Sequence, residues 1–404
     1  MKTVSSPALA AARSYSVYAL IGVTVAHLLN DAMQSAVPAV FPLLRQTLDL
    51  SFAQVGWIAF MLNVTACVLQ PFIGSLTDKR PMPLLLPGGM LFSLIGIIGM
   101  AYSSHFVGLL ISAMLLGIGS SVLHPESSRV AHLAAGKSHG MAQSVFQVGG
   151  NTGQALAPLA VGFLVMPYGT RGLIMFAFAA VLGIFLQYAV SRWYKQQLVA
   201  PKKVQTAAAA VQHPRGFVAL AISLLIVLLF SKFVYIASMT GYYSFYYMDR
   251  FHRPFEDAQI PLFALQFAGM LGTLLGGPLA DRFGRKKIIW FSIAGTAPFS
   301  LLLPYVTPFW SIILCGLIGA ILMSGFSVII VYAQALLPGK IGTVSGLFFG
   351  LAFGLAGLGS VIMGWLIDLT DVSFVIQICA FLPLLGLLAM FLPSDNKLAG
   401  NARG

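Results

Sequence analysis

Charged residues are scarce in this chain of 404 residues. They make up 8% of it, and only 11 residues are acidic, whereas 58% are hydrophobic. An ordinary soluble domain carries about 25% charged residues, so the composition excludes that class. It predicts an all-α membrane protein, because an apolar chain satisfies its backbone groups in lipid by forming helices. At about 20 residues for each span, the chain has room for about a dozen spans.

Cysteine is also rare. The three cysteines, Cys67, Cys315 and Cys379, lie far apart inside apolar runs, which excludes a disulfide framework and a cysteine-ligated metal site. The sequence has no Gly-x-x-x-x-Gly-Lys loop, which argues against an ATP-driven pump. The net charge of +12 does not indicate a nucleic-acid partner, because the basic residues lie between apolar runs, where membrane topology alone explains them.

Sliding-window hydropathy predicts twelve transmembrane helices. Of the 23 basic residues, 18 fall in the two tails and in the connections after even-numbered spans. Because cytoplasmic loops are enriched in Lys and Arg, we expect both termini in the cytoplasm and the chain in the cell inner membrane. The predicted spans are residues 16–43, 52–75, 83–102, 106–131, 140–166, 171–191, 216–247, 258–280, 288–304, 309–333, 342–367 and 372–392.

A repeated motif divides the chain. Gly74-Ser-Leu-Thr-Asp78-Lys79 recurs 203 residues later as Gly277-Pro-Leu-Ala-Asp281-Arg282, which indicates that a six-helix unit was duplicated. We therefore predict two pseudo-symmetric six-helix bundles. The predicted boundaries are 1–15 for a cytoplasmic tail, 16–191 for the N-terminal bundle, 192–215 for a basic cytoplasmic linker, 216–392 for the C-terminal bundle and 393–404 for a second tail.

The first predicted span carries a polar stripe. His27, Asn30, Asp31 and Gln34 follow the spacing i, i+3, i+4, i+7, so they share one face of a helix. A stripe that includes a carboxylate lines a cavity or meets another helix, because facing lipid is costly. We interpret Asp31 as a proton carrier and its three neighbours as substrate contacts. The alternative is a purely structural set of hydrogen bonds between helices.

The fourth predicted span ends in ionisable residues. His124, Pro125, Glu126 and Arg129 occur within six residues, and Glu126 and Arg129 share a helix face. We interpret Glu126 as a second proton carrier, and Arg129 and His124 as substrate contacts. One alternative is a structural ion pair. Another is a membrane-embedded metal enzyme that uses His124 and Glu126, but too few further ligands are in view for a convincing metal site.

Lys232 is the one basic residue placed well inside a predicted span of the second half. Tyr235 and Tyr242 follow on the same helix face. A buried cation beside aromatic rings suits an anionic head group with an apolar remainder. The alternative is that Lys232 pairs with Asp31 or Glu126 for structure alone.

The loop from Gly277 to Lys286 resembles the signature loop of the major facilitator superfamily. The resemblance implies two six-helix bundles with the substrate site between them, and a gating role for Asp281, Arg282 and Arg285. In the first copy Asp78 matches the motif, but Pro81-Met-Pro stands where the motif continues with Gly and Arg. The gating role is therefore carried over with less support to Asp78.

Six further motifs extend this resemblance over both halves of the chain: 27–35, 124–131, 143–151, 231–233, 332–339 and 345–354. They resemble drug-efflux members of the superfamily. That implies export of a phosphonate antibiotic or another small drug by alternating access, with the proton gradient as energy source and no cofactor. Ala113 and Ala157 depart from the general drug-antiporter pattern, so the coupling residues need not match it.

We therefore expect a transporter and not an enzyme, a monomer, with a small molecule, protons and the lipid bilayer as partners. A proton-coupled importer of a small organic anion with the same fold remains an alternative, because transport direction is not written in these motifs. A passive channel is a third alternative. The loop motif and the buried carboxylates argue against it.

Overall fold

The computed structural model describes residues 16–134, 139–198, 214–337 and 341–398, and the regular structure among them is helical throughout. The elements are α2 (Val17–Ala39), α3 (Phe41–Leu48), α4 (Phe52–Lys79), α5 (Leu85–Tyr102), α6 (Phe106–Ala134), α7 (His139–Ala160), η1 (Val161–Val165), η2 (Met166–Ile174), α8 (Met175–Gln197), α9 (Arg215–Phe251), α10 (Phe255–Phe283), α11 (Arg285–Ala294), α12 (Ala297–Leu302), η3 (Leu303–Tyr305), α13 (Pro308–Met323), α14 (Phe326–Leu336), α15 (Ile341–Leu369), α16 (Val372–Cys379), η4 (Leu382–Phe391) and α17 (Asp395–Leu398).

Ten helical stretches among the described residues are long and apolar enough to cross a membrane. The predicted number of twelve is not reached by length and hydropathy alone, for two physical reasons. Helix α2 has the length, but its stripe of His27, Asn30, Asp31 and Gln34 lowers its hydropathy. The stretch Val145–Gln197 counts once although its 53 residues would extend over about 80 Å as one helix, more than twice the hydrocarbon core. Gly169, with φ of 62°, breaks it into two directions.

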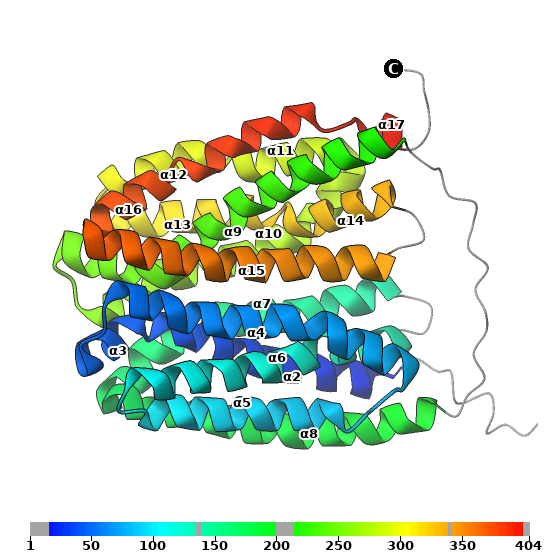
Figure 1. Ribbon diagram of the computed structural model, residues 1–404, viewed down its shortest axis with the longest axis horizontal. Helices are drawn as coiled ribbons and strands as arrows, with labels where there is room; N and C mark the ends of the chain where they lie inside the picture. The colour runs from blue at the N-terminus through cyan, green and yellow to red at the C-terminus, as the bar shows by residue number, and fades with distance from the viewer. Residues whose placement is uncertain (1–15, 135–138, 199–213, 338–340, 399–404) are drawn as a thin grey trace, which may run out of the picture.

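The helices of the first part of the chain lie together, and so do the helices of the second part. Figure 1 shows α2 to α8, drawn blue to green, in its lower part, and α9 to α17, drawn green to red, in its upper part. We call residues 16–198 the first half and residues 214–398 the second half. The start of α2 and the short helix α17 lie at the same end of the molecule in this view.

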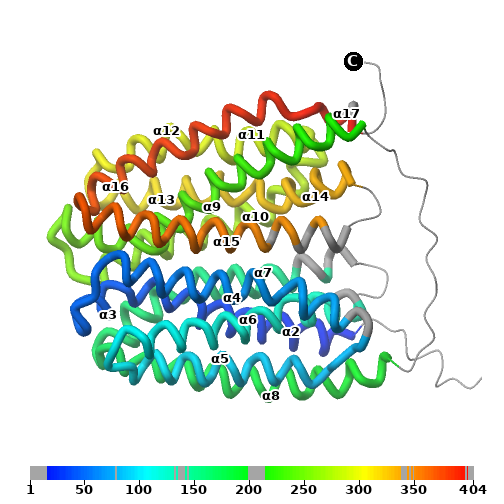
Figure 2. The backbone as a smooth tube through the Cα atoms, in the orientation of Figure 1, coloured from blue at the N-terminus to red at the C-terminus, as the bar shows by residue number. Residues whose placement is uncertain are grey.

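Two pairs of helices form the main seams between the halves. Helix α4 packs along α15, and α7 packs along α10; the tube in Figure 2 shows α4 and α15 side by side. Two hydrogen bonds cross these seams midway. The Cys67 thiol donates to the Gly350 carbonyl at 2.8 Å, and the Thr152 hydroxyl donates to the Met270 sulfur at 3.3 Å.

Large apolar side chains cover the outside of the helices. Phe178 is 78% exposed, Phe72 69% and Phe185 68%, far more than an aqueous surface tolerates as a continuous feature. Polar side chains are instead buried between helices, as a lipid environment requires.

Candidate functional site

A buried carboxylate, Asp31 on α2, lies at the centre of the polar cluster. It is 4% exposed, and each of its oxygens faces an imidazole. His27 Nε2 lies 3.4 Å from Asp31 Oδ2, and His124 Nε2 of α6 lies 3.5 Å from Asp31 Oδ1. The spacing i, i+4 brings His27 to Asp31 within one helix, whereas His124 reaches them because α6 packs against α2.

Both rings are fixed by backbone carbonyls on their other nitrogen. His27 Nδ1 lies 2.9 Å from the Phe146 carbonyl of α7, and His124 Nδ1 lies 3.0 Å from the Ser120 carbonyl in its own helix. The two rings meet edge to face with centroids 4.9 Å apart. Because the Nδ1 atoms are engaged, the two Nε2 atoms are directed at the carboxylate.

Amide groups complete the surroundings of Asp31. Gln154 Nε2 of α7 donates to Oδ2 at 2.8 Å, and Asn30 Nδ2 donates to Oδ1 at 3.2 Å. Asn30 in turn accepts from the Ser93 hydroxyl of α5 at 3.2 Å. Gly150 of α7 has no room for a side chain, since a Cβ there would collide with the His27 ring. Gln34, one turn beyond Asp31, is partly buried and forms no side-chain hydrogen bond with the described residues.

Glu126 faces a different partner. Its carboxylate is fully buried and lies 3.6 Å from Arg129 Nε, three residues along α6. The Arg129 guanidinium also donates to the Thr77 carbonyl at 2.7 Å and to the Thr77 hydroxyl at 3.1 Å. The pair therefore fastens α6 to the end of α4, which is the arrangement expected of a structural ion pair. As placed here, the guanidinium is engaged by protein groups.

This placement corrects the metal-enzyme alternative, which needed His124 and Glu126 together. His124 faces Asp31 and Glu126 faces Arg129, because residues two apart on a helix point in different directions. Among the described residues, the one group with nitrogen and oxygen atoms close enough to share a metal ion is His27, Asp31 and His124, within 4.8 Å of one another. The same contacts would also suit a shared proton.

Lys232 on α9 is 1% exposed, and its ammonium donates to the Leu322 carbonyl of α13. That carbonyl is in the last turn of α13, where carbonyls lack partners within the helix and the helix end attracts a cation. No contact among the described residues joins Lys232 to Asp31 or Glu126, so the alternative of a structural pair with either carboxylate is not found among them. The polar cluster lies in the first half and Lys232 in the second.

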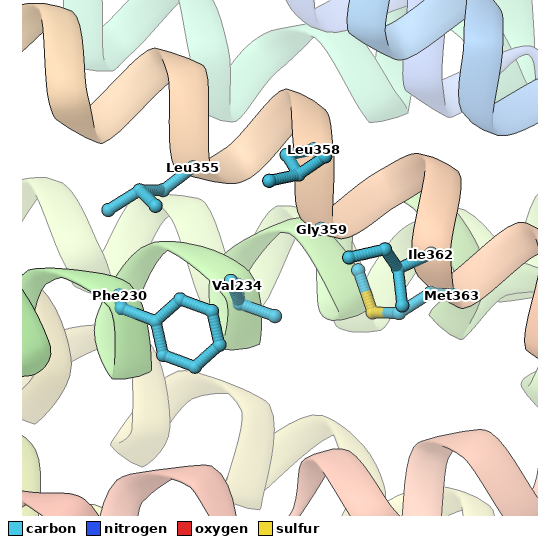
Figure 3. A pocket seen from close by; sticks show the side chains of 7 residues that line it. All are labelled: Phe230, Val234, Leu355, Leu358, Gly359, Ile362 and Met363. Carbon is cyan, nitrogen blue, oxygen red and sulfur yellow. The ribbon is translucent and has the colours of Figure 1, made fainter.

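The two tyrosines of α9 are deeply buried. Tyr235 is 1% exposed and Tyr242 is inaccessible. The Tyr242 hydroxyl donates to the Ser360 carbonyl of α15 at 2.6 Å, so it binds neighbouring backbone here. A small apolar pocket of about 80 Å³ lies between α9 and α15. Figure 3 shows its lining of aliphatic, phenyl and thioether side chains, which offers no polar group to a ligand.

The motif predicted as a loop is mostly helical, because residues 277–283 form the end of α10 and Arg285 begins α11, with Gly284 between the two helices. Asp281 and Arg282 are exposed and Arg285 is partly buried, and Arg282 lies over the Phe283 ring at 5.3 Å. Asp281 forms no ion pair with another described residue. The acceptor for the start of α11 is instead Asp395, whose Oδ2 lies 3.4 Å from the Lys286 backbone nitrogen. The side chain of Asp78 lies outside the described residues.

Two polar residues of the structure were not predicted from the sequence. Gln154 lies three residues beyond Asn151 and seven beyond Gln147, and this helical spacing of amides was the signal that could have placed it beside the polar stripe of α2. The second is Asp368 at the end of α15, whose carboxylate accepts from two backbone N–H groups of α4. The partners in that contact are backbone N–H groups. Nearly every residue has one, so the sequence does not reveal the contact.

The resemblance predicted from the motifs is confirmed. Residues 23–358 match the family model described as Major Facilitator Superfamily. The fosmidomycin resistance protein of Escherichia coli (strain K12) is 47% identical over 98% of this chain and 97% of its own length. An uncharacterized MFS-type transporter of Bacillus subtilis (strain 168) is 42% identical over 98% of this chain and 97% of its own length.

The fold is also found among solved structures. A crystal structure of the nucleoside transporter NupG superposes with a TM-score of 0.67 and 16% sequence identity, covering 93% of this chain and 98% of that one. At this identity the likeness shows the fold alone. Family model, relatives and fold agree: the chain belongs to the Major Facilitator Superfamily, and it is a multi-pass membrane transporter and not an enzyme.

Proposed function

We propose that this transporter exports fosmidomycin or similar small drugs in exchange for protons. The observation that carries the proposal is Asp31, a carboxylate buried between apolar helices and in contact with two imidazoles. Carboxylates and histidines inside a membrane protein are typical of proton relays. The name of the relative that shares 47% of its residues supports a phosphonate drug as substrate.

The proposed architecture is twelve transmembrane helices in two six-helix bundles that alternate access around a site between them. Ten of these spans follow from length and hydropathy. Helix α2 and a second pass within Val145–Gln197 supply the other two. The bundles correspond to residues 16–191 and 216–392, joined by the basic linker 192–215, with tails at 1–15 and 393–404. The protein acts as a monomer in the cell inner membrane with both tails cytoplasmic.

In this proposal Asp31 and Glu126 carry protons through the first half. His27, His124, Asn30 and Gln34 contact the substrate or hold the carboxylate in place. A proton on Asp31 removes a buried negative charge. The two protonation states of Asp31 therefore favour different packing of the neighbouring helices around α2. No cofactor is needed, because the proton gradient supplies the energy.

Lys232 binds the anionic head group in the second half, with Tyr235 and Tyr242 as the wall beside it and Arg129 as a further cation. Its burial supports this role, because a desolvated ammonium with one carbonyl acceptor has two more N–H groups to offer. Asp281, Arg282 and Arg285, together with Asp78 in the first copy, form the gating loops. The exposure of Asp281 and Arg282 leaves these two side chains free to change partners as the halves move.

The test is uptake of labelled fosmidomycin into everted membrane vesicles with an imposed proton gradient. We expect accumulation that requires an acidic lumen and stops when the gradient is collapsed. Accumulation that is indifferent to the gradient would remove the antiport claim. Accumulation in right-side-out vesicles under the physiological gradient would favour the importer instead.

A further inference from the structure

His27 has a defined hydrogen position on one of its ring nitrogens. Its Nδ1 lies 2.9 Å from the Phe146 carbonyl oxygen, and a carbonyl oxygen only accepts hydrogen bonds. Nδ1 therefore carries a hydrogen and donates it. His124 is different, because its Nδ1 lies 3.0 Å from the Ser120 carbonyl and 3.1 Å from the Ser120 hydroxyl, and a hydroxyl either donates or accepts.

The contact between the other nitrogen of His27, Nε2, and Asp31 then requires a proton. A neutral ring with its hydrogen on Nδ1 presents a lone pair at Nε2, and Asp31 Oδ2 presents lone pairs to the same gap of 3.4 Å. Two facing lone pairs repel, whereas a proton on either atom turns the contact into a charge-assisted hydrogen bond. The observed contact is therefore stable with one proton between these two atoms.

We infer that the exchanged proton is held between His27 Nε2 and Asp31 Oδ2, which makes His27 a proton-binding residue and not a substrate contact. The inference rests on the proposed proton antiport and locates its proton. The imidazole and carboxylate form one site that takes up and releases a single proton, so neither side chain suffices alone.

The groups facing this pair come from three other helices. From α6, His124 Nε2 lies 3.5 Å from the second carboxylate oxygen. From α7, the Gln154 amide donates to the same oxygen that faces His27, while the Phe146 ring stacks on His27 with centroids 4.1 Å apart. From α5, Ser93 reaches the pair only through Asn30. His124 is thus the one further titratable side chain in contact with the pair among the described residues.

The protein shields the Nε2 side of His27 from direct contact with solvent. His27 is 2% exposed, and the backbone of Gly150 covers the Nε2 side of the ring so closely that a Cβ would collide with it. Direct access of water to His27 Nε2 therefore needs movement of α7 relative to α2, whereas the other oxygen of the carboxylate faces His124, whose side chain is 22% exposed. Helix α7 also contacts the second half, where the Thr152 hydroxyl donates to the Met270 sulfur. Loss of the proton repels Asp31 from a ring that is anchored to α7, and so loosens a helix that lies on a seam between the halves.

The direct test is ¹⁵N nuclear magnetic resonance of the full-length protein, labelled at histidine and held in lipid nanodiscs. The chain has seven histidines, and the His27 signals are those absent from a His27→Gln spectrum. A variant that keeps only His27 and His124 gives the same assignment if His27→Gln does not fold. We expect His27 to keep its hydrogen on Nδ1 at every pH, and its Nε2 protonation step to be altered by Asp31→Asn. A neutral ring with its hydrogen on Nε2, or a step unaffected by Asp31→Asn, would overturn the inference.

A transport assay distinguishes failure of this inference from failure of the proposed function. In reconstituted vesicles, His27→Gln is expected to lose gradient-driven accumulation of fosmidomycin while keeping exchange of labelled for unlabelled drug without a gradient. His105→Gln is the control, because His105 is exposed and caps the start of α6; it should retain both. If the wild type responds to the gradient and His27→Gln accumulates normally, the inference alone is wrong. If the wild type ignores the gradient, the antiport proposal fails whatever the spectra show.

Discussion

The carboxylate of Asp368 caps the first turn of a helix in the opposite half of the chain, at Phe52. Its Oδ1 accepts from the Phe52 backbone N–H at 2.8 Å, and its Oδ2 accepts from the Ala53 N–H at 2.7 Å. The first N–H groups of a helix have no partner within it, and a negative charge beside them is favourable. One side chain of α15 thus fastens the α4–α15 seam at the end opposite the basic loops.

The same end of the seam is closely packed. Gly364, one turn before Asp368, has no room for a side chain, because a Cβ there would collide with the Phe52 carbonyl. The Tyr242 hydroxyl reaches the Ser360 carbonyl in the same stretch. A gap between α4 and α15 at this end therefore requires both the carboxylate contact and the glycine contact to separate.

Asp368→Asn should weaken this closure. The amide keeps one acceptor oxygen but loses the charge, and a charge at a helix N-terminus contributes about 0.3–1 kcal/mol at an exposed position. We expect a larger population with the halves apart at this end. Spin labels at Trp57 and Leu369, both exposed, in a background with the native cysteines replaced, should report a longer mean distance.

Asp371→Asn is the matched control. Asp371 carries the same charge nearby, but it caps its own helix by accepting from the Phe374 N–H at 2.8 Å and makes no contact across the seam among the described residues. An equal lengthening in both variants would mean that surface charge at this end, and not the contact with α4, governs the distance.

The sequence was most informative where a charge interrupts an apolar run. Asp31, Glu126, Arg129 and Lys232 were found on that basis, and all of them are buried or partly buried in the structure. The i, i+4 spacing also predicted that His27 and Asp31 share a face, and i, i+3 did so for Glu126 and Arg129. These contacts form within one helix, so local periodicity is enough to predict them.

Partners from different helices could not be predicted in this way. The alternative pairing of Lys232 with Asp31 or Glu126 rested on opposite charge alone, whereas the structure gives its ammonium a backbone carbonyl at the end of α13. Only the metal-enzyme alternative grouped His124 with Glu126 by sequence position, and packing of α6 on α2 turns His124 to Asp31. Backbone partners and helix packing are set by the three-dimensional arrangement, which residue types alone do not encode.

Glu126→Gln tests whether the second buried carboxylate carries a proton or only holds Arg129. The substitution keeps the side-chain length and an acceptor oxygen but cannot be ionised. We expect loss of gradient-driven accumulation with exchange retained, because proton binding and release is what the amide lacks. Accumulation and exchange are measured in the same reconstituted vesicles.

Thr77→Val is the matched structural variant for Glu126. It removes the hydroxyl that accepts from the charged Arg129 side chain at 3.1 Å, at a cost of about 1.5–3 kcal/mol in the free energy of unfolding, while leaving both charges in place. It should lower thermal stability and keep coupled transport. If Glu126→Gln instead lowers stability and reduces exchange and accumulation together, Glu126 serves the fold and the carrier role is wrong.

Lys232 decides whether the second half recognises an anion. A desolvated ammonium that lacks a carboxylate partner is costly to bury, so Lys232→Gln should leave the unfolding temperature unchanged or raise it. Transport of an anionic drug should nevertheless fall, while a cationic substrate is spared. Lys232→Arg should recover part of the anion transport, because a forked guanidinium keeps the charge but not the compact shape of the ammonium.

The measurement is drug resistance in cells that make each variant at matched levels, with one anionic and one cationic compound. Lys287→Gln removes an exposed cation at the start of α11 and controls for overall charge; it should affect neither compound. A lower unfolding temperature with equal loss for both compounds would show that Lys232 stabilises the end of α13 through the Leu322 carbonyl. Unchanged resistance to the anion would place the head-group site elsewhere. Arg129 would then be the next residue to test, because its side chain is partly exposed and would lose its ion pair when Glu126 takes up a proton.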